Sequence, residues 1–166
     1  MPFIAFLRFL ALRSVSMNAA TVLLLNLIST WYMVGLIWLI QLVHYKLFDR
    51  VGRDVFAAYA VEHARLITPI VGIPMLVEIA TAGYLVVTPP AGVDKGFLTT
   101  GFAMVLLLWA ATAFLSVPCH NILAGGFDSV AYQRLVGTNW IRTILWSARG
   151  VLMAYLAYRY IDALSS

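Results

Sequence analysis

The sequence predicts an all-α integral membrane protein built as a four-helix bundle, with short amphipathic surface helices in its loops. Of the 166 residues, 63% are apolar and only 11% are charged, whereas charged residues make up about 25% of a soluble domain. Four long stretches carry one charge or none, and a helix needs about 20 apolar residues to cross a hydrocarbon core of about 30 Å. The alternation of apolar and polar residues typical of membrane β-strands is absent. Helical spans are therefore expected.

The chain forms a single predicted transmembrane domain, with spans at about residues 18–42, 66–87, 97–117 and 140–161. The fourth apolar stretch is short, and it reaches spanning length because Arg142 and Arg159 can extend their guanidinium groups toward the headgroups. An additional apolar segment with two arginines, residues 1–14, is a candidate interfacial helix.

The connections differ in length and character. The Pro-Pro-Ala-Gly run that begins at Pro89 ends the second span, and the two prolines within that span predict a kink. Amphipathic surface helices are predicted from about Asp54 toward the second span and in the run FDSVAYQRLV before the fourth. The face with the two longer loops carries six Lys or Arg residues against four on the other face, which predicts cytoplasmic long loops. Orientation by the N-terminal arm, through Arg8 and Arg13, would reverse this assignment.

The chain has three histidines, and the predicted topology brings all of them to the long-loop face. His44 follows the first span, His63 precedes the second and His120 follows the third. Imidazole is well suited to zinc, copper, iron or haem iron, and bundles build such sites from facing helices. The pattern therefore predicts a metal or haem site at this face. Candidates to complete or orient its ligand shell are Glu62, Asp128 and Gln41.

The same histidines have a second interpretation, in which they cap helices or pair with loop carboxylates at the membrane interface. Glu62 and His63 are adjacent, so they would point about 100° apart on a helix. The Glu-x-x-His spacing of di-iron bundles is absent. The sequence identifies no catalytic residue, and it leaves open whether the protein is an enzyme.

Charged and polar residues are also expected inside the membrane. At 1.5 Å per residue, Glu78 lies about 18 Å into the second span and Arg149 about 13 Å into the fourth. A lone charge at such depth costs at least about 2.5–3.5 kcal/mol, so a buried pair is expected. Arg142 lies seven residues before Arg149 and shares its helix face, which predicts a polar stripe with Asn139 and Thr143. The pair either fixes the second helix against the fourth, relays protons or binds an acidic substrate.

Several motifs carry a resemblance to a known family. They are HYKLF, the run ITPIVGIPM with Glu78 three residues after it, VPCH and TNWIRT. Over about residues 31–157 the chain resembles uncharacterised four-helix bacterial inner-membrane proteins. The resemblance implies this architecture and a bacterial inner membrane, and it implies no activity. The architecture is also similar to that of anthrone-oxygenase-like and copper-resistance-D-like membrane proteins, a likeness of fold from which no residue is carried over.

Three functions are compatible with these features. The first is a histidine-based metal or haem protein with a redox-linked role. The second is a non-catalytic accessory subunit of a larger respiratory or photosynthetic membrane complex, with other membrane subunits or further copies of the chain as partners. The third is a small transporter that uses Glu78 and Arg149. The lipid bilayer is a partner in each, and the modest formal charge of +4 does not indicate a nucleic-acid partner.

Overall fold

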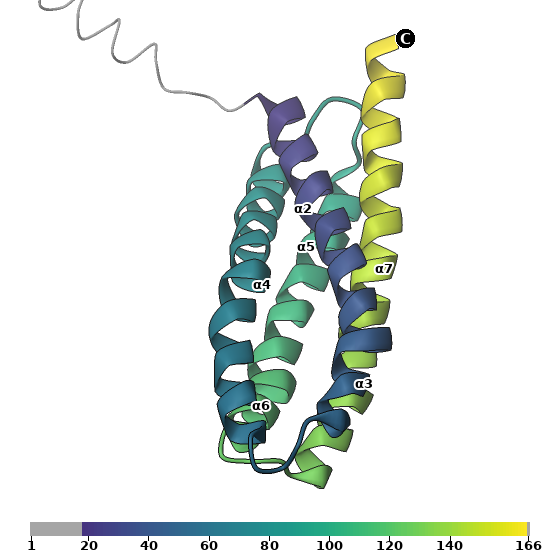
Figure 1. Cartoon of the computed structure of the whole chain (residues 1–166). Helices are drawn as coiled ribbons and strands as arrows, with labels where there is room; N and C mark the ends of the chain where they lie inside the picture. The colour runs from purple at the N-terminus through teal and green to yellow at the C-terminus, as the bar shows by residue number, and fades with distance from the viewer. Residues whose placement is uncertain (1–17, 166) are drawn as a thin grey trace, which may run out of the picture.

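The computed structural model describes residues 18–165, and the candidate interfacial helix at residues 1–14 lies outside them. Within this range the chain is helical and contains no strand (Figure 1). Four long helical runs lie side by side and alternate in direction along the bundle. The predicted all-α class is confirmed for the described part of the chain.

The first helical run is continuous but not uniform. α2 spans Ala19–Leu39, and the Asn18 side chain caps it by accepting a hydrogen bond from the backbone N–H of Ala20. Three short segments extend the run: a π-helical segment at Ile40–His44, α3 at Tyr45–Leu47 and a 3₁₀ turn at Phe48–Arg50.

The second run, α4, is a single helix that spans Phe56–Val87. The surface helix predicted from about Asp54 forms the first part of this same helix. The helix continues through Pro69 and Pro74 without interruption, so the two prolines do not divide it.

The third run begins at α5, Lys95–Ala111, where Asp94 caps the helix by accepting hydrogen bonds from two backbone N–H groups. A π-helical segment, Thr112–Ser116, and α6, Val117–Leu123, complete this run. The fourth run is α7, Ser129–Ser165.

Two segments predicted to lie outside the spans belong to the long helical runs. The third run does not end at residue 117, because Pro118 lies at the start of α6, where a missing backbone N–H is tolerated. α7 begins at Ser129 and not at about residue 140, so most of the run FDSVAYQRLV lies in its first turns. The connections at this end of the bundle are therefore only residues 51–55 and 124–128. His120 consequently lies within a helix, not after one.

Three of the four helical runs are long and apolar enough to cross a membrane: Ala19–Arg50, Phe56–Val87 and Lys95–Leu123. α7 is longer than any of these single runs but more polar. Large apolar side chains such as Ile73 and Phe114 are exposed on the outside of the bundle, at 62% and 74% of their surface. This exterior fits a membrane protein, because a water-soluble surface rarely exposes so continuous an apolar area.

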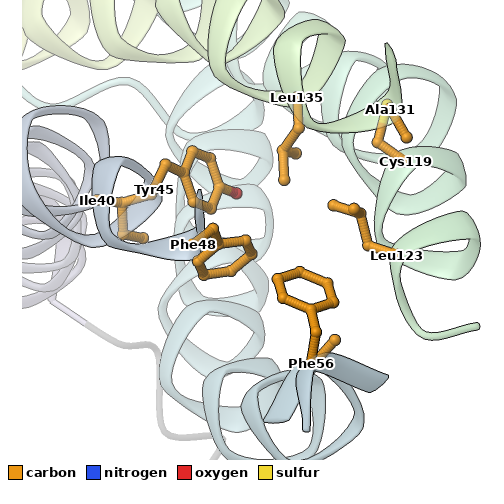
Figure 2. Close-up of a cluster of buried hydrophobic side chains, with 9 residues drawn as sticks. Ile40, Tyr45, Phe48, Phe56, Cys119, Leu123, Ala131 and Leu135 are labelled. Carbon is orange, nitrogen blue, oxygen red and sulfur yellow. The ribbon is translucent and has the colours of Figure 1, made fainter. Parts of the chain in front are cut away.

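Apolar clusters fill the space between the helices. α2 contacts α4 and α7, and α5 contacts the same two helices, which closes the bundle. At the end that carries the loops 51–55 and 124–128, Tyr45, Phe48 and Phe56 pack toward Leu123 and Leu135 (Figure 2). This cluster joins all four runs just beside the histidines.

A buried ion pair lies in the middle of the bundle. Nε of Arg149 lies 3.2 Å from Oε1 of Glu78, and their side chains are 0% and 1% exposed. Thr30 and Trp146 also donate hydrogen bonds to the Glu78 carboxylate, at 2.7 Å and 2.9 Å. The structure thus brings together the two charged residues predicted to pair.

Arg149 extends the same network to the remaining helices. Its terminal N–H groups donate to the carbonyl oxygen of Gly101, at 2.6 Å, and to Oδ1 of Asn26, at 2.7 Å. Asn26 in turn donates to the Thr81 hydroxyl, at 2.7 Å. The network therefore links α2, α4, α5 and α7 at one level.

Removal of one partner of this pair should destabilise the protein strongly. For Arg149→Met or Glu78→Gln we expect the free energy of unfolding, measured by SDS titration in mild detergent, to fall by about 3–5 kcal/mol, because a buried charge loses its partner. Arg65→Met is the matched control, since the Arg65–Glu62 pair is exposed. A loss for Arg149→Met no larger than that for Arg65→Met would contradict a stabilising role for the network.

Candidate functional site

The three histidines meet at one end of the bundle. His44 lies on the first π-helical segment, His63 on α4 and His120 on α6. Nε2 of His44 lies 3.0 Å from Nδ1 of His63, and the rings of His63 and His120 have centroids 5.6 Å apart. The structure therefore brings the predicted residues into lateral contact, which equal depth in the membrane could not establish.

Aromatic side chains hold the imidazole rings in place. The Tyr45 hydroxyl lies 3.1 Å from Nε2 of His120. Phe48 packs its ring edge-on against His44 and His63, with centroids 5.1 Å and 5.2 Å away. Tyr45 and Phe48 belong to the apolar cluster shown in Figure 2, so this cluster orients the three rings from one side.

The residues predicted to support a metal shell have other partners. Glu62 is exposed and pairs with Arg65, three residues later on the same helix. Asp128 caps α7, and Gln41 bonds to Asn139 instead of orienting a histidine. Among residues 18–165, no group of three or more His, Cys, Asp or Glu side chains is arranged to hold a metal ion. In the described structure these three residues have other partners, so their role in a ligand shell stays a prediction.

The predicted polar stripe on α7 is buried. Asn139, Arg142 and Thr143 have exposures of 4% or less. One terminal nitrogen of Arg142 donates to Oγ of Ser116 and to Oδ1 of Asn139, each at 3.1 Å. The guanidinium also lies 5.2 Å from the ring centroid of Trp146. None of the ion pairs in the described part of the chain includes Arg142.

A pocket of about 210 Å³ lies between α4 and the run from α5 to α6. Its walls are mostly apolar, and its polar lining includes His63, His120 and Arg142. Thr68 and Val117 line the pocket and are also exposed, one on each side. The pocket therefore opens sideways between two helices, on the surface that a bilayer would cover.

Two residues that line the pocket, Trp109 and Arg142, each have a buried N–H donor without a hydrogen-bond partner within the described structure, Nε1 and Nε respectively. A buried donor without an acceptor costs about 1–3 kcal/mol, and native proteins leave few of them. An acceptor atom on a bound molecule is one way to satisfy such donors.

Both π-helical segments border this region. Ile40 and Tyr45 line the pocket at the first segment or directly after it, and Thr112 and Ser116 line it from the second. Single π-helical turns within longer helices are frequent at functional sites. The sequence did not predict these segments, and it did not predict Trp109 as a site residue, because an aromatic residue in an apolar helix is common in packing.

Comparisons of the chain with family models, with curated proteins and with solved structures find no match. The resemblance to four-helix bacterial inner-membrane proteins therefore stays a prediction.

Two tryptophans, one whose Nε1–H has an acceptor and one whose Nε1–H has none, provide a test of the unpartnered donor of Trp109. Trp146→Phe removes a bond to the Glu78 carboxylate, and we expect it to lower the free energy of unfolding by about 1.5–3 kcal/mol. Trp109→Phe removes a donor that has no partner, so we expect an unchanged or higher value in the absence of ligand. Both are measured by SDS titration in the same detergent. Equal losses in the two variants would show that Trp109 has an acceptor in the protein.

Proposed function

We propose that the chain is a four-span membrane protein that binds an amphipathic, lipid-soluble molecule in the pocket between α4 and the α5–α6 run. One observation carries this proposal: two residues that line the apolar pocket, Trp109 and Arg142, each keep a buried N–H donor without a partner. A fully apolar ligand would leave both donors unpaired, and a fully polar one would not suit the walls. A molecule with an acceptor head and an apolar body satisfies both requirements.

The fourth span is part of the proposal. α7 contacts α2 and α5, two of the helices that are apolar enough to span. Its buried residues include Arg142 and Arg149, whereas Ile144 and Val151 are exposed at 63% and 67% of their surface. A helix that turns its charges inward and its large apolar residues outward fits within a bilayer. The Lys and Arg distribution favours a cytoplasmic position for the histidine end, and the resemblance favours a bacterial inner membrane.

The side opening supports access from the bilayer. A ligand dissolved in the hydrocarbon could move between α4 and α6 without passing through water, since the exposed Thr68 and Val117 flank the opening. The cavity of about 210 Å³ is smaller than the ~300–1,000 Å³ of pockets that enclose drug-sized ligands. The pocket therefore accommodates a head group and the first carbons of a chain, and a longer tail would lie along the outside of the bundle.

A pocket-filling variant tests this function directly. Gly72 lines the pocket, and a Cβ built there meets no atom within 4 Å. Gly72→Leu should therefore place its Cβ without a clash, extend its side chain into the pocket and abolish ligand binding. The matched control is Gly35→Leu, because Gly35 lies on the exposed side of α2 and its Cβ also meets no atom.

Binding is measured by native mass spectrometry of the protein released from detergent micelles, with oleic acid and oleyl alcohol as probes. We expect a saturable one-to-one adduct with at least one probe, lost in Gly72→Leu and retained in Gly35→Leu. If neither probe gives a saturable adduct with the wild-type protein, or if Gly72→Leu binds as the wild type does, the proposed function is wrong.

A second candidate function is a histidine metal centre. It is favoured by the 3.0 Å separation of the ring nitrogens of His44 and His63, which is close to the ~3.3 Å between two nitrogens each about 2.0 Å from a tetrahedral zinc ion. His120 would have to turn away from Tyr45 to become the third ligand. Zinc, copper, iron and haem iron are all forms of this candidate.

Metal stoichiometry by elemental mass spectrometry checks the second candidate. It predicts near-unit metal in the detergent-purified wild-type protein, lost in His44→Ala, His63→Ala and His120→Ala. Substoichiometric metal that is unchanged in the three variants would remove this candidate and would leave the amphiphile site unaffected.

The other two hypotheses have less support. The transporter hypothesis depends on Glu78 and Arg149, whose mutual bonds and bonds to neighbouring helices favour a structural role. The accessory-subunit hypothesis depends on the apolar exterior, which suits lipid as well as a second protein.

A further inference from the structure

We infer that the head group bound in this pocket is an anion, a carboxylate or a phosphate, whose charge is neutralised by Arg142. The inference rests on the proposed amphiphile site and specifies its ligand class. The decisive feature is the electrostatic environment of Arg142, which differs from that of the other buried arginine on the same helix.

Arg142 is a buried cation without an acidic partner. Only 4% of the surface of Arg142 is exposed. All seven acidic residues of the chain lie within the described range, and none forms an ion pair with it. Its hydrogen-bond partners are the neutral side chains of Ser116 and Asn139. A desolvated charge is normally compensated by an opposite charge as well as by hydrogen bonds, so the compensating charge is expected from outside the chain.

Arg149 provides an internal comparison. It lies seven residues further along the same face of α7 and is also buried, with 0% of its surface exposed. Unlike Arg142, it pairs with an acidic residue, Glu78, at 3.2 Å. The two arginines thus share helix, face and burial, and they differ in that only Arg149 has its counter-charge in the protein. That difference coincides with the pocket, which Arg142 lines and Arg149 does not.

The donors around the pocket suit an anionic head. Arg142 contributes an unpartnered Nε–H and Trp109 an unpartnered Nε1–H, and a carboxylate or a phosphate has several oxygens to accept them. Hydrogen bonds to a charged acceptor are about twice as strong as neutral ones. An alcohol or an ester could accept the same bonds, but it would leave the charge of Arg142 uncompensated.

The site also has the right position for an amphiphile. His63 and His120 line the pocket near the polar end of the bundle, and Val71 and Met75 line it deeper within the apolar part of α4. An anionic head held at Arg142 would therefore leave its tail beside apolar side chains and the hydrocarbon. A free inorganic anion would gain nothing from these walls.

The test compares three probes by native mass spectrometry: oleic acid at a pH at which it is ionised, oleyl alcohol with the same chain, and dioleoyl phosphatidic acid. With the wild-type protein we expect at least one anion to bind at least tenfold more tightly than the alcohol. A preference for oleate identifies a carboxylate amphiphile as the ligand, and a preference for phosphatidic acid identifies a phosphate lipid. Either result supports the inference.

The sharpest variant is Asn139→Asp. Asn139 accepts a hydrogen bond from Arg142 at 3.1 Å and does not line the pocket. An aspartate of nearly the same shape would therefore supply Arg142 with an internal carboxylate. It would lose the hydrogen bond that Nδ2 of Asn139 donates to Gln41, a residue that does not line the pocket either. We expect the affinity for the preferred anion to fall at least tenfold and the affinity for oleyl alcohol to stay the same. Arg142→Gln should have the same selective effect, and thermal unfolding confirms that each variant is folded.

The failures of the two proposals are distinguishable. Equal affinities of the anions and the alcohol for the wild-type protein, with no selective effect of Asn139→Asp, would overturn the anionic head and leave the amphiphile site standing. No binding of any probe to the wild-type protein would overturn both.

Discussion

The arrangement of this bundle depends on the buried pair of Glu78 and Arg149. In a core that water does not reach, every polar group must find its partner within the protein. The pair does so by recruiting side-chain and backbone groups from all four helical runs at one level. Apolar packing alone permits helices to rotate and slide, because many apolar surfaces are nearly equivalent. A network with defined hydrogen-bond directions restricts this freedom, so it sets the rotation of each helix.

The rotation of each helix also determines which side chains face the interior at the level of Arg142 and the histidines. On α7, residues seven apart share a face, so the orientation that places Arg149 inward also places Arg142 inward, two turns nearer the histidines. Between the two levels, α2 and α5 each pass into a π-helical segment. An additional residue in a helix rotates the next turns of that helix by about 100°. The π-helical segments therefore allow His44 and Ser116 to face the site without disturbing the packing around Glu78.

The sequence predicted those features that derive from the bilayer and from topology. Apolar length predicted the helices, the cost of isolated charge predicted the Glu78–Arg149 pair, and alternation of direction predicted three histidines at one end. It did not predict the lining of the pocket, because Trp109 in an apolar helix is indistinguishable from a packing residue until its Nε1 is seen without an acceptor. Nor did it predict the local partners of Glu62 and Asp128, which are an exposed i,i+3 pair with Arg65 and the cap of α7.

The two buried arginines also differ in their contribution to the free protein. Arg149 has its counter-charge within the chain, so its pairing contributes to folding whether or not a ligand is present. Arg142 has only neutral partners, so the unliganded state retains an uncompensated desolvation cost at this position. A ligand that supplies the charge binds the folded state selectively and stabilises it in proportion to RT ln(1 + [L]/Kd). Binding at the proposed site would therefore be coupled to the stability of the bundle through Arg142. One face of α7 would then contribute to folding through Arg149 and to recognition through Arg142.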